Sequence, residues 1–249
     1  MSENNNNQKK YSLYVVSLPI GNSEDITIRA KKILEESEII AAEDTRKAKN
    51  WIGRVQIKTK ARFIAYHSHN EENSAEGIMK LLLSKGSVCL VSDAGTPRIS
   101  DPGYALIRKC YENEIPVISI PGASSLTSAL SVSPLPVSPL LFLGFITPKE
   151  KKRLNFLEGF RDYDGTVVFF ETVHRIQKLT GAIINAWGNL EVFIIREITK
   201  VNEEYFWGTL DDSLLWLDKK KGEFIIIVNK RKKNKMLIKN KVFADNNLK

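Results

Sequence analysis

The chain has 249 residues, of which 43% are hydrophobic, and a formal net charge of +8 at pH 7. This length is enough to bury one large hydrophobic core or two small ones. No apolar run reaches the length of a membrane span, and residues 1–11 lack the apolar segment of a secretory signal and are predicted to be a disordered lead-in. We therefore expect a cytoplasmic protein that does not bind membranes.

The positive charge is concentrated near the end of the chain. Residues 230–249 hold eight Lys/Arg and one Asp, a net +7, residues 1–10 add +1, and residues 11–229 are neutral. A basic block beside a neutral body is typical of a segment that contacts nucleic acid, although a solvated end or an anionic surface gives the same pattern. We expect nucleic-acid phosphates to be its partner.

Short β-rich runs alternate with helical runs in the first half of the chain. The expected strands are 13–17, 38–42, 62–65, 87–91 and 116–120, and the expected helices are 26–36, 45–52, 75–83, 104–112 and 124–130. We predict that Asp25 caps the first helix and that Asp101, followed by Pro102, caps the fourth. This alternation predicts an α/β fold with a parallel sheet and helices on both faces.

Three prolines within residues 134–139 interrupt this pattern and predict a linker. A second unit follows, with expected strands 140–145, 166–170, 191–195, 204–208 and 223–228 and expected helices 149–160, 175–187 and 211–217. The short connection between strands 191–195 and 204–208 favours antiparallel pairing and therefore a mixed sheet. The predicted organisation is a domain over 12–133, a linker over 134–139, a second domain over 140–229 and a basic tail over 230–249.

Three glycine-containing loops, 18–22, 93–103 and 121–125, follow expected strands of the first unit. Parallel strands present their carboxyl ends at one edge of the sheet, where α/β proteins bind ligands, so these loops are expected to meet there. Asp93 and Asp101 would repel a polyphosphate, and the chain has no G-x-G-x-x-G fingerprint for a nicotinamide cofactor. The acidic groups suit a ligand with positive charge and hydroxyl groups, such as a ribose.

Further polar side chains follow strands in both units. Glu43 and Asp44 begin an expected helix, where the dipole favours carboxylates, but one of them could also orient a substrate hydroxyl. Arg196, Glu197 and Lys200 lie just past a strand, either as a surface ion pair or as a phosphate clamp with a proton acceptor. No His or Cys spacing completes a metal site, so no metal is expected.

Eight motifs, taken in order, resemble those of one family. They are Tyr14–Asn22, Ala41–Arg46, Val91–Gly103, Ile120–Gly122, Leu143–Phe145, Phe170–Glu171 with His174–Arg175, Arg196–Lys200 and Lys221–Phe224. On these motifs, residues 12 to 229 are identified as a member of the ribosomal RNA small-subunit methyltransferase I family. That family has the two-domain tetrapyrrole-methylase (class III methyltransferase) fold, with an N-terminal parallel sheet and a C-terminal mixed sheet.

The resemblance implies an S-adenosylmethionine-dependent enzyme that methylates the ribose 2′-oxygen of a cytidine in the decoding region of 16S rRNA. It also implies a cofactor site in the cleft between the domains, a homodimer, and 16S rRNA or the small ribosomal subunit as partner. A sulfonium ligand with an ammonium group and a ribose agrees with acidic, glycine-containing loops, and the basic tail agrees with an RNA substrate.

The matching motifs also imply site residues. For the cofactor these are Pro19, Gly21, Asp93, Ala94, Gly95, Thr96, Ser124 and Ser125, with Phe170 and Phe224 closing the pocket from the second domain. The polar groups expected to act as catalytic residues on the substrate side are Glu43, Asp44, Glu197 and Lys200. The residues expected to contact RNA are Arg46, Arg98, Arg196, Lys230, Arg231, Lys232 and Lys233.

Arg98 stands where the family pattern has glycine. If the backbone there has φ > 0, arginine is strained, and if it does not, the side chain is available to face RNA. Two alternative functions stay open. One is a methylase of a small tetrapyrrole precursor, which would have no use for the basic tail. The other is a non-catalytic rRNA-binding assembly factor in which the loops are structural.

Overall fold

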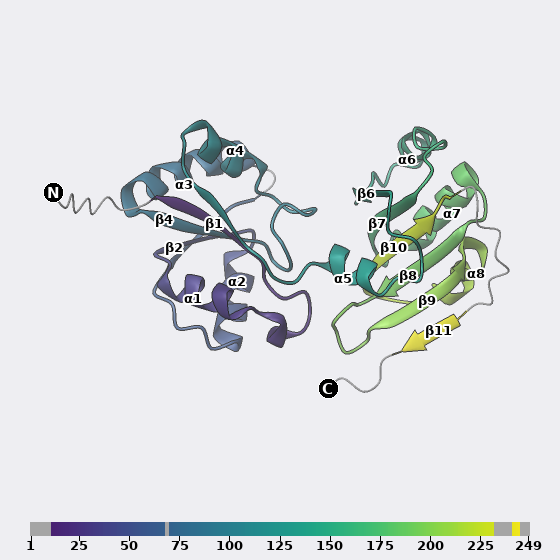
Figure 1. The fold of residues 1–249 in the computed structure, drawn as a ribbon, viewed down its shortest axis with the longest axis horizontal. Coiled ribbons are helices and arrows are strands. Elements are labelled where there is room, and N and C mark those ends of the chain that lie inside the picture. Colours follow the sequence, from purple (N-terminus) through teal and green to yellow (C-terminus); the bar gives the residue numbers. More distant parts are fainter. Residues whose placement is uncertain (1–10, 68–69, 232–240, 245–249) are drawn as a thin grey trace, which may run out of the picture. The chain divides into compact units, whose positions relative to one another are not determined.

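The computed structural model describes residues 11–67, 70–231 and 241–244, and the chain divides into two compact units, Met1–Ser124 and Ser125–Lys249 (Figure 1). The division places helix α5 (Ser125–Ser131) in the second unit, where it contacts strand β10 (Glu223–Asn229). The predicted domain bounds at 133 and 140 stay predictions. Within the described residues, no helix combines the length and the apolar character needed to cross a bilayer.

The first unit is built on a five-stranded parallel sheet of order β3-β2-β4-β1-β5. Its strands are β1 (Ser12–Val16), β2 (Ile39–Ala42), β3 (Arg62–Ala65), β4 (Ser87–Val91) and β5 (Val117–Ile120). All five lie where the sequence predicts them, because each is a short run of apolar residues followed by a turn. The parallel sheet confirms the predicted architecture of this unit.

Helices cover both faces of this sheet (Figure 1). Helices α1 (Ile28–Glu36) and α2 (Thr45–Arg54) share a buried cluster with Cys89 and Val91 of β4, whereas α3 (Glu71–Lys85) and α4 (Tyr104–Glu112) pack with Val88 and Leu90. Successive residues of β4 thus face opposite layers, as the period of a strand requires. Both cysteines are buried, Cys89 in β4 and Cys110 in α4.

Two predicted helix caps are wrong. Asp25 ends a 3₁₀ turn, η1 (Ser23–Asp25), and the side chain of Thr27 caps α1 instead by accepting the N–H of Ala30 at 3.1 Å. Helix α4 begins at Tyr104 with Gly103 as its N-cap residue, so neither Asp101 nor Pro102 starts it. Gly103 has φ of +147°, and a Cβ there would lie 2.7 Å from Arg98 Cγ, which excludes a capping side chain at this position.

The second unit is built on a mixed six-stranded sheet of order β11-β9-β8-β10-β7-β6, in which only β6 and β7 pair in parallel. The strands other than β10 are β6 (Leu140–Gly144), β7 (Thr166–Thr172), β8 (Glu191–Arg196), β9 (Glu204–Thr209) and β11 (Lys241–Ala244). Helices α6 (Glu150–Glu158), α7 (Ile176–Trp187) and α8 (Leu210–Trp216) pack on one face through a large apolar cluster. The antiparallel β8–β9 pair and the mixed sheet are confirmed.

Strand β11 is not predicted from the sequence. It lies within the basic tail and pairs antiparallel with β9, with Lys241 opposite Trp207 and Phe243 opposite Tyr205. Lys241, Val242 and Phe243 are exposed, and the short run Lys241–Ala244 lacks the alternation of apolar and polar residues that marks a half-buried strand. A part of the tail is therefore an edge strand of the second sheet.

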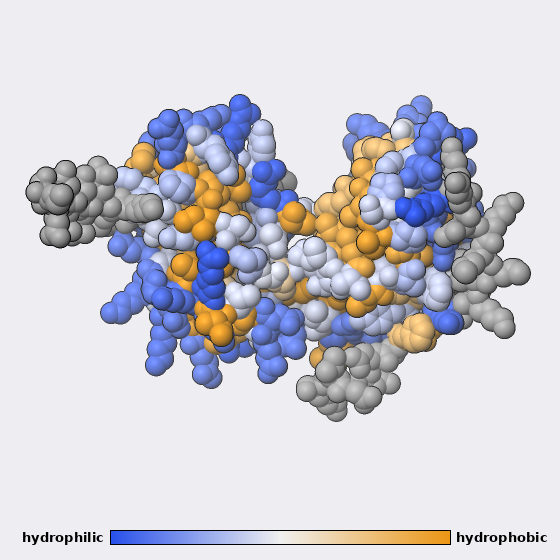
Figure 2. All heavy atoms as spheres, in the orientation of Figure 1, coloured by the Kyte–Doolittle hydropathy of each residue, from blue (hydrophilic) through white to orange (hydrophobic). Residues whose placement is uncertain are grey.

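Hydrophobic side chains gather on the surface of the second unit over β6 and β7 (Figure 2). Leu140 and Phe145 are among the exposed apolar residues of this region. The rings of Phe142 and Phe145 both contact the buried ring of Phe170 edge to face, with centroid distances of 4.9 and 5.7 Å. The end of β7 thus lies beneath a partly exposed aromatic cluster.

Candidate functional site

The carboxyl edge of the first sheet holds four loops that are joined by hydrogen bonds. The loops after β1 and β4 form a reciprocal pair, in which the N–H of Leu18 donates to the carbonyl of Gly95 at 2.9 Å and the N–H of Gly95 donates to the carbonyl of Leu18 at 3.0 Å. Gly95 has φ of +72°, and a Cβ there would lie 3.1 Å from Ile20 Cγ2. Glycine is therefore required for this close approach.

A chain of polar contacts extends from this pair to the loop after β5. The hydroxyls of Ser17 and Thr96 lie 2.8 Å apart, and Thr96 Oγ1 also donates to the carbonyl of Ala123 at 3.1 Å. A Cβ on Gly122 would lie 3.1 Å from the Ser17 Cβ, so this loop passes directly over β1. The contacts bring the loop that holds Ala94, Gly95 and Thr96 next to the loop that holds Pro19 and Gly21 and to the loop that holds Ser124.

Asp93 connects the fourth loop, which follows β2. Its Oδ1 accepts the N–H of Asp44 at 3.1 Å, and its Oδ2 pairs with Lys47 Nζ at 2.7 Å. The hydrogen bond and charge of Asp93 raise the pKa of Lys47. Lys47 is a member of the site that the sequence analysis missed, although its position one turn after Asp44 places it at the same helix end.

Glu43 and Asp44 are neighbours whose pKa values are shifted in opposite directions. Burial raises the pKa of Glu43 above 4.5, and the nearby Asp93 carboxylate adds to the rise. Asp44 is the N-cap of α2, and the N–H groups of Arg46 and Lys47, which donate to its carboxylate at 2.8 and 3.3 Å, lower its pKa. Of the two, Glu43 is the better proton acceptor and Asp44 is held as a cap.

The loop from Asp93 to Gly103 contains two strained residues. Arg98 has φ of +74° and Ser100 has φ of +69°. Left-handed backbone costs a residue with a Cβ roughly 1–2 kcal/mol. The backbone at Arg98 is therefore strained, which is the outcome expected from the sequence for arginine at a position with φ > 0. The exposed guanidinium lies 5.2 Å from the centroid of the Tyr104 ring, which stabilises this conformation by cation–π attraction.

In the second unit, Glu197 and Lys200 belong to an ion-pair network at the end of β8. Lys200 Nζ lies 3.1 Å from Glu197 Oε1 and 2.8 Å from Glu223 Oε2, and the N–H of Glu223 donates to Glu197 Oε1 at 2.8 Å. Burial opposes the charge of Lys200, but the two carboxylates outweigh it and raise its pKa. Lys200 is therefore a cation at neutral pH and not a proton acceptor.

Arg196 is engaged inside the second unit. Its Nε donates to the carbonyl of Lys221 at 2.5 Å, and its Nη1 donates to the carbonyl of Asn202 at 2.9 Å and to Glu204 Oε2 at 3.0 Å. These contacts brace the segment between β8 and β9. The predicted contact of Arg196 with a phosphate would have to share or replace them, and it stays a prediction.

The end of β7 carries a buried carboxylate beside Phe170. Glu171 is fully buried, accepts the N–H of Thr172 at 2.9 Å and lies 3.1 Å from Arg175 Nε, while its Oε2 has no hydrogen-bond partner among the described residues. Burial raises its pKa, against the charges of Arg175 and Arg153. The motif around 170–175 is recognisable in the sequence. The burial that makes Glu171 unusual depends on the packing of the sheet and could not be predicted from the neighbouring residues.

Predicted RNA-contacting residues lie in several places. Arg46 is exposed in the first turn of α2. Lys230 Nζ lies 4.0 Å from the centroid of the Trp187 ring and donates to the carbonyl of Arg161 at 3.1 Å, and burial lowers its pKa to about 8. Arg231 donates to the carbonyl of Ser138. Lys232 and Lys233 lie outside the described residues.

Comparison with known proteins identifies the class. A family model for tetrapyrrole (corrin/porphyrin) methylases matches residues 12–213. The ribosomal RNA small subunit methyltransferase I of Halalkalibacterium halodurans is 41% identical over 221 residues, which are 88% of this chain and 76% of that protein. The protein of the same name from Thermotoga maritima is 39% identical over 219 residues, 87% of this chain and 97% of that protein.

The fold is similar to that of uroporphyrin-III C-methyltransferase from Thermus thermophilus in complex with S-adenosylhomocysteine. The TM-score is 0.61 at 14% identity, over 88% of this chain and 96% of that chain. Fold and family match together define a class III methyltransferase. The chain belongs to the tetrapyrrole methylase family and, within it, to the ribosomal RNA small subunit methyltransferase I family, so the predicted family, fold class and enzyme class are confirmed.

The methyl donor of this enzyme is S-adenosylmethionine, as predicted. The loops of the first unit fit such a donor, because the carboxylates of Asp93 and Glu43 lie near each other at this edge, beside a turn at Gly95 that admits no side chain. Carboxylates and backbone carbonyls suit a sulfonium and an ammonium group, and carboxylates accept hydrogen bonds from ribose hydroxyls. The same charges would repel a polyphosphate.

Proposed function

We propose that the chain transfers the methyl group of S-adenosylmethionine to the ribose 2′-oxygen of a cytidine in the decoding region of 16S rRNA. The observation that carries the proposal is the match, at 39–41% identity over most of the chain, to relatives named for ribosomal RNA small-subunit methylation. The basic tail of the chain supports an RNA substrate, since phosphate contacts dominate RNA affinity. The working form is a cytoplasmic homodimer that binds 16S rRNA or the small subunit.

The reaction is an in-line displacement, in which a bond forms between the 2′-oxygen and the methyl carbon as the bond from that carbon to sulfur breaks. The cofactor supplies the activated methyl group. The residues of this chain must align the 2′-oxygen with that methyl and accept the hydroxyl proton. Asp93, with the backbone of Gly95 and Thr96, is the element that orients the donor, because its loop is fixed to three others.

The electrostatics of the loops favour one of the candidate proton acceptors. A general base works best when its pKa lies near the working pH, and burial moves the pKa of Glu43 toward it. Asp44 is held ionised by the backbone N–H groups that it caps, and Lys200 is held protonated by two carboxylates. Glu43 is therefore the proton acceptor in this proposal, and Glu197 and Lys200 orient the substrate ribose.

Two surfaces bind the phosphates. Arg46 and Arg98 are exposed at the ligand-binding edge of the first unit, where a flanking phosphate could reach both the loop and helix α2. In the second unit, Lys230 to Lys233 and Arg196 complete the predicted RNA-contacting set. Such contacts position the RNA and leave the choice of base to groups at the reaction site.

One experiment separates this proposal from its alternatives. Three parallel incubations each contain the protein and methyl-labelled S-adenosylmethionine. The first adds bare small subunits, the second extracted 16S rRNA and the third a porphyrinogen. Label in one cytidine ribose of the rRNA is the expected result. Label only in the porphyrinogen would establish the small-molecule methylase, and an absence of cofactor binding by calorimetry would leave the assembly factor.

Glu197→Ala and Lys200→Ala variants that keep full turnover would remove these residues from the catalytic set.

A further inference from the structure

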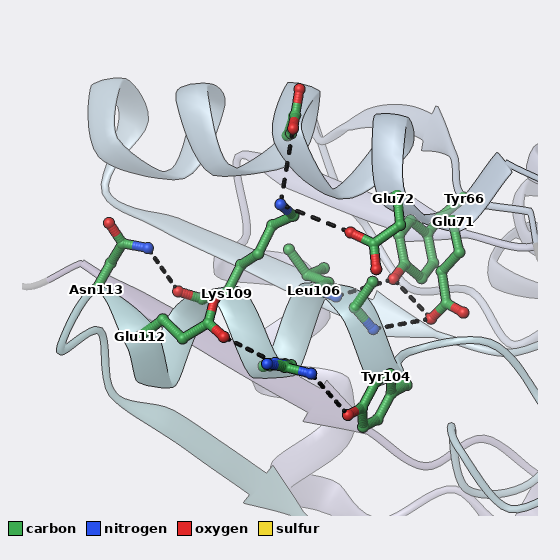
Figure 3. A network of polar contacts seen from close by, with 11 residues as sticks. Tyr66, Glu71, Glu72, Tyr104, Leu106, Lys109, Glu112 and Asn113 are labelled. Atoms are coloured by element: carbon green, nitrogen blue, oxygen red, sulfur yellow. Dashed lines mark hydrogen bonds and ion pairs between the residues drawn. The ribbon is translucent and has the colours of Figure 1, made fainter.

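The end of the Asp93–Gly103 loop is held by a side chain from a different helix. Glu71, the first residue of α3, accepts the N–H of Gly103 at 2.8 Å and the N–H of Ala105 at 3.1 Å through the same oxygen, Oε1. Tyr66 donates its hydroxyl to that oxygen at 2.9 Å and accepts the N–H of Leu106 at 3.1 Å. Figure 3 shows Tyr66 and Glu71 converging on the first turn of α4.

These contacts replace the cap that α4 lacks. The first N–H groups of a helix need acceptors, and a side chain at the N-cap normally provides one. Gly103 has no side chain to do so, and its close approach to Arg98 and Leu90 allows none. Glu71 and Tyr66 supply the acceptors from 32 and 40 residues earlier in the chain.

The two ends of the loop are thus anchored in different ways. At its beginning, Asp93 and Gly95 are tied to the loops after β2 and β1. At its end, Glu71 holds Gly103. Between these anchors lie Arg98 and Ser100, both with positive φ. Strained backbone persists only where the surroundings hold it, so releasing one anchor should let the segment between them relax.

We infer that Glu71 is a positioning residue for cofactor binding, which it serves by fixing the end of the Asp93–Gly103 loop against helix α4. The inference rests on the proposed placement of the cofactor on this loop. The Glu71 carboxylate is suited to holding the loop. Burial alone would raise its pKa, but the hydrogen bonds from the backbone N–H groups and from Tyr66 outweigh burial and lower the pKa, so that Glu71 accepts as an anion at neutral pH.

The neighbouring Glu72 offers a matched control. It is the next residue of α3 and has the same charge, but its side chain is 73% exposed and its ion pair, at 3.6 Å, is with Lys109 Nζ. Glu71→Ala removes the anchor, Glu71→Gln keeps a neutral acceptor of the same size, and Glu72→Ala removes a charge without touching the loop.

The test combines three measurements on full-length protein: hydrogen exchange of the Gly103, Ala105 and Leu106 amides, the Kd of S-adenosylmethionine by calorimetry, and steady-state kinetics on small subunits. For Glu71→Ala we expect faster exchange at these amides and a Kd and cofactor KM at least about tenfold higher, or about 1.4 kcal/mol. The kcat at saturating cofactor should fall much less, since the donor still reaches the same site. Glu71→Gln should recover part of the affinity, and Glu72→Ala should match the wild type.

The inference is overturned if a folded Glu71→Ala protein binds the cofactor as tightly as the wild type. Where the alanine variant does not fold, the inference is overturned if Glu71→Gln exchanges the three amides faster and still binds the cofactor as tightly as the wild type. It is also overturned if the affinity falls while exchange at the three amides is unchanged. Wild-type protein that binds no S-adenosylmethionine would instead refute the placement of the cofactor, and hydrogen exchange would still show whether Glu71 holds the loop.

Discussion

Asp93 joins two loops of the first unit, because its Oδ1 accepts the backbone N–H of Asp44 at 3.1 Å. The contact links the end of β4 to the N-terminus of α2. The second oxygen of Asp93 makes a different contact, an ion pair at 2.7 Å with Lys47, whose side chain is 67% exposed. The internal hydrogen bond and the exposed ion pair can therefore be tested separately.

Asp93→Ala is expected to weaken S-adenosylmethionine binding by about tenfold or more, because it removes a charge from the site and leaves the Asp44 N–H without its acceptor. Lys47→Met should change the Kd less than about fivefold, since an exposed ion pair contributes under about 1 kcal/mol. Calorimetry on both variants measures the difference. Equal losses of affinity in the two would show that the ion pair, and not the loop contact, matters.

The strained residue of the same loop gives a second prediction. Arg98→Gly removes left-handed strain of roughly 1–2 kcal/mol but also loses the contact with Tyr104 and increases the freedom of the unfolded chain. The free energy of unfolding should therefore change by less than about 1 kcal/mol. RNA affinity should fall. The magnitude of the slope of log K against log salt concentration should decrease by about 0.7 to 0.9, which corresponds to the loss of one phosphate contact. Ser100→Gly, which relieves a similar strain without removing a charge, is the control and should leave that slope unchanged.

The comparison of sequence and structure shows where local patterns fail. The strands of both sheets except β11 could be predicted, because each is an apolar run with a turn after it. The start of α4 could not, since its capping group is Glu71, 32 residues away. The contacts of Arg196 with Asn202 and Lys221 could not be predicted either, because a sequence shows the charge of a side chain and not its partners. Strand β11 depends on pairing with β9, which a run of four residues within a basic tail does not indicate.

The raised pKa of Glu43 predicts the pH dependence of methylation. A base must be unprotonated to accept the 2′-hydroxyl proton, so activity should be lost as the pH falls through the pKa of Glu43. Burial and Asp93 raise that pKa, which places the acid limb of kcat/KM above pH 4.5. Glu43→Gln should abolish most turnover and keep cofactor affinity. Asp44→Asn retains the cap of α2 and should move the limb only slightly toward lower pH, because the Asp44 charge is the smallest of the contributions that raise the pKa of Glu43. An unshifted acid limb in an active Glu43→Gln protein would assign the base elsewhere.

The buried Glu171 predicts a coupled loss of stability in the second unit. Glu171→Ala leaves Arg175 and Arg153 near each other without their carboxylate, and breaking a buried pair in this way costs about 3–5 kcal/mol. The double variant Glu171→Ala/Arg175→Met should lose less than the sum of the two single variants. Urea unfolding followed by tryptophan fluorescence reports mainly on this unit, which contains Trp187, Trp207 and Trp216, whereas the first unit contains Trp51. Strictly additive losses would mean that Glu171 and Arg175 act independently.

The Glu197–Lys200 pair can be displaced without changing either residue. Gly222 has φ of +118°, and a Cβ there would lie 2.5 Å from Glu197 Oε1, whereas Gly188 has φ of +87° and open space around it. Alanine should destabilise the unit at both positions, by roughly 1 kcal/mol or more, because both require left-handed backbone. Only Gly222→Ala should also lower turnover on small subunits, because it pushes the Glu197 carboxylate away from Lys200. Unchanged kcat in a folded Gly222→Ala protein would show that this ion pair has no part in orienting the ribose.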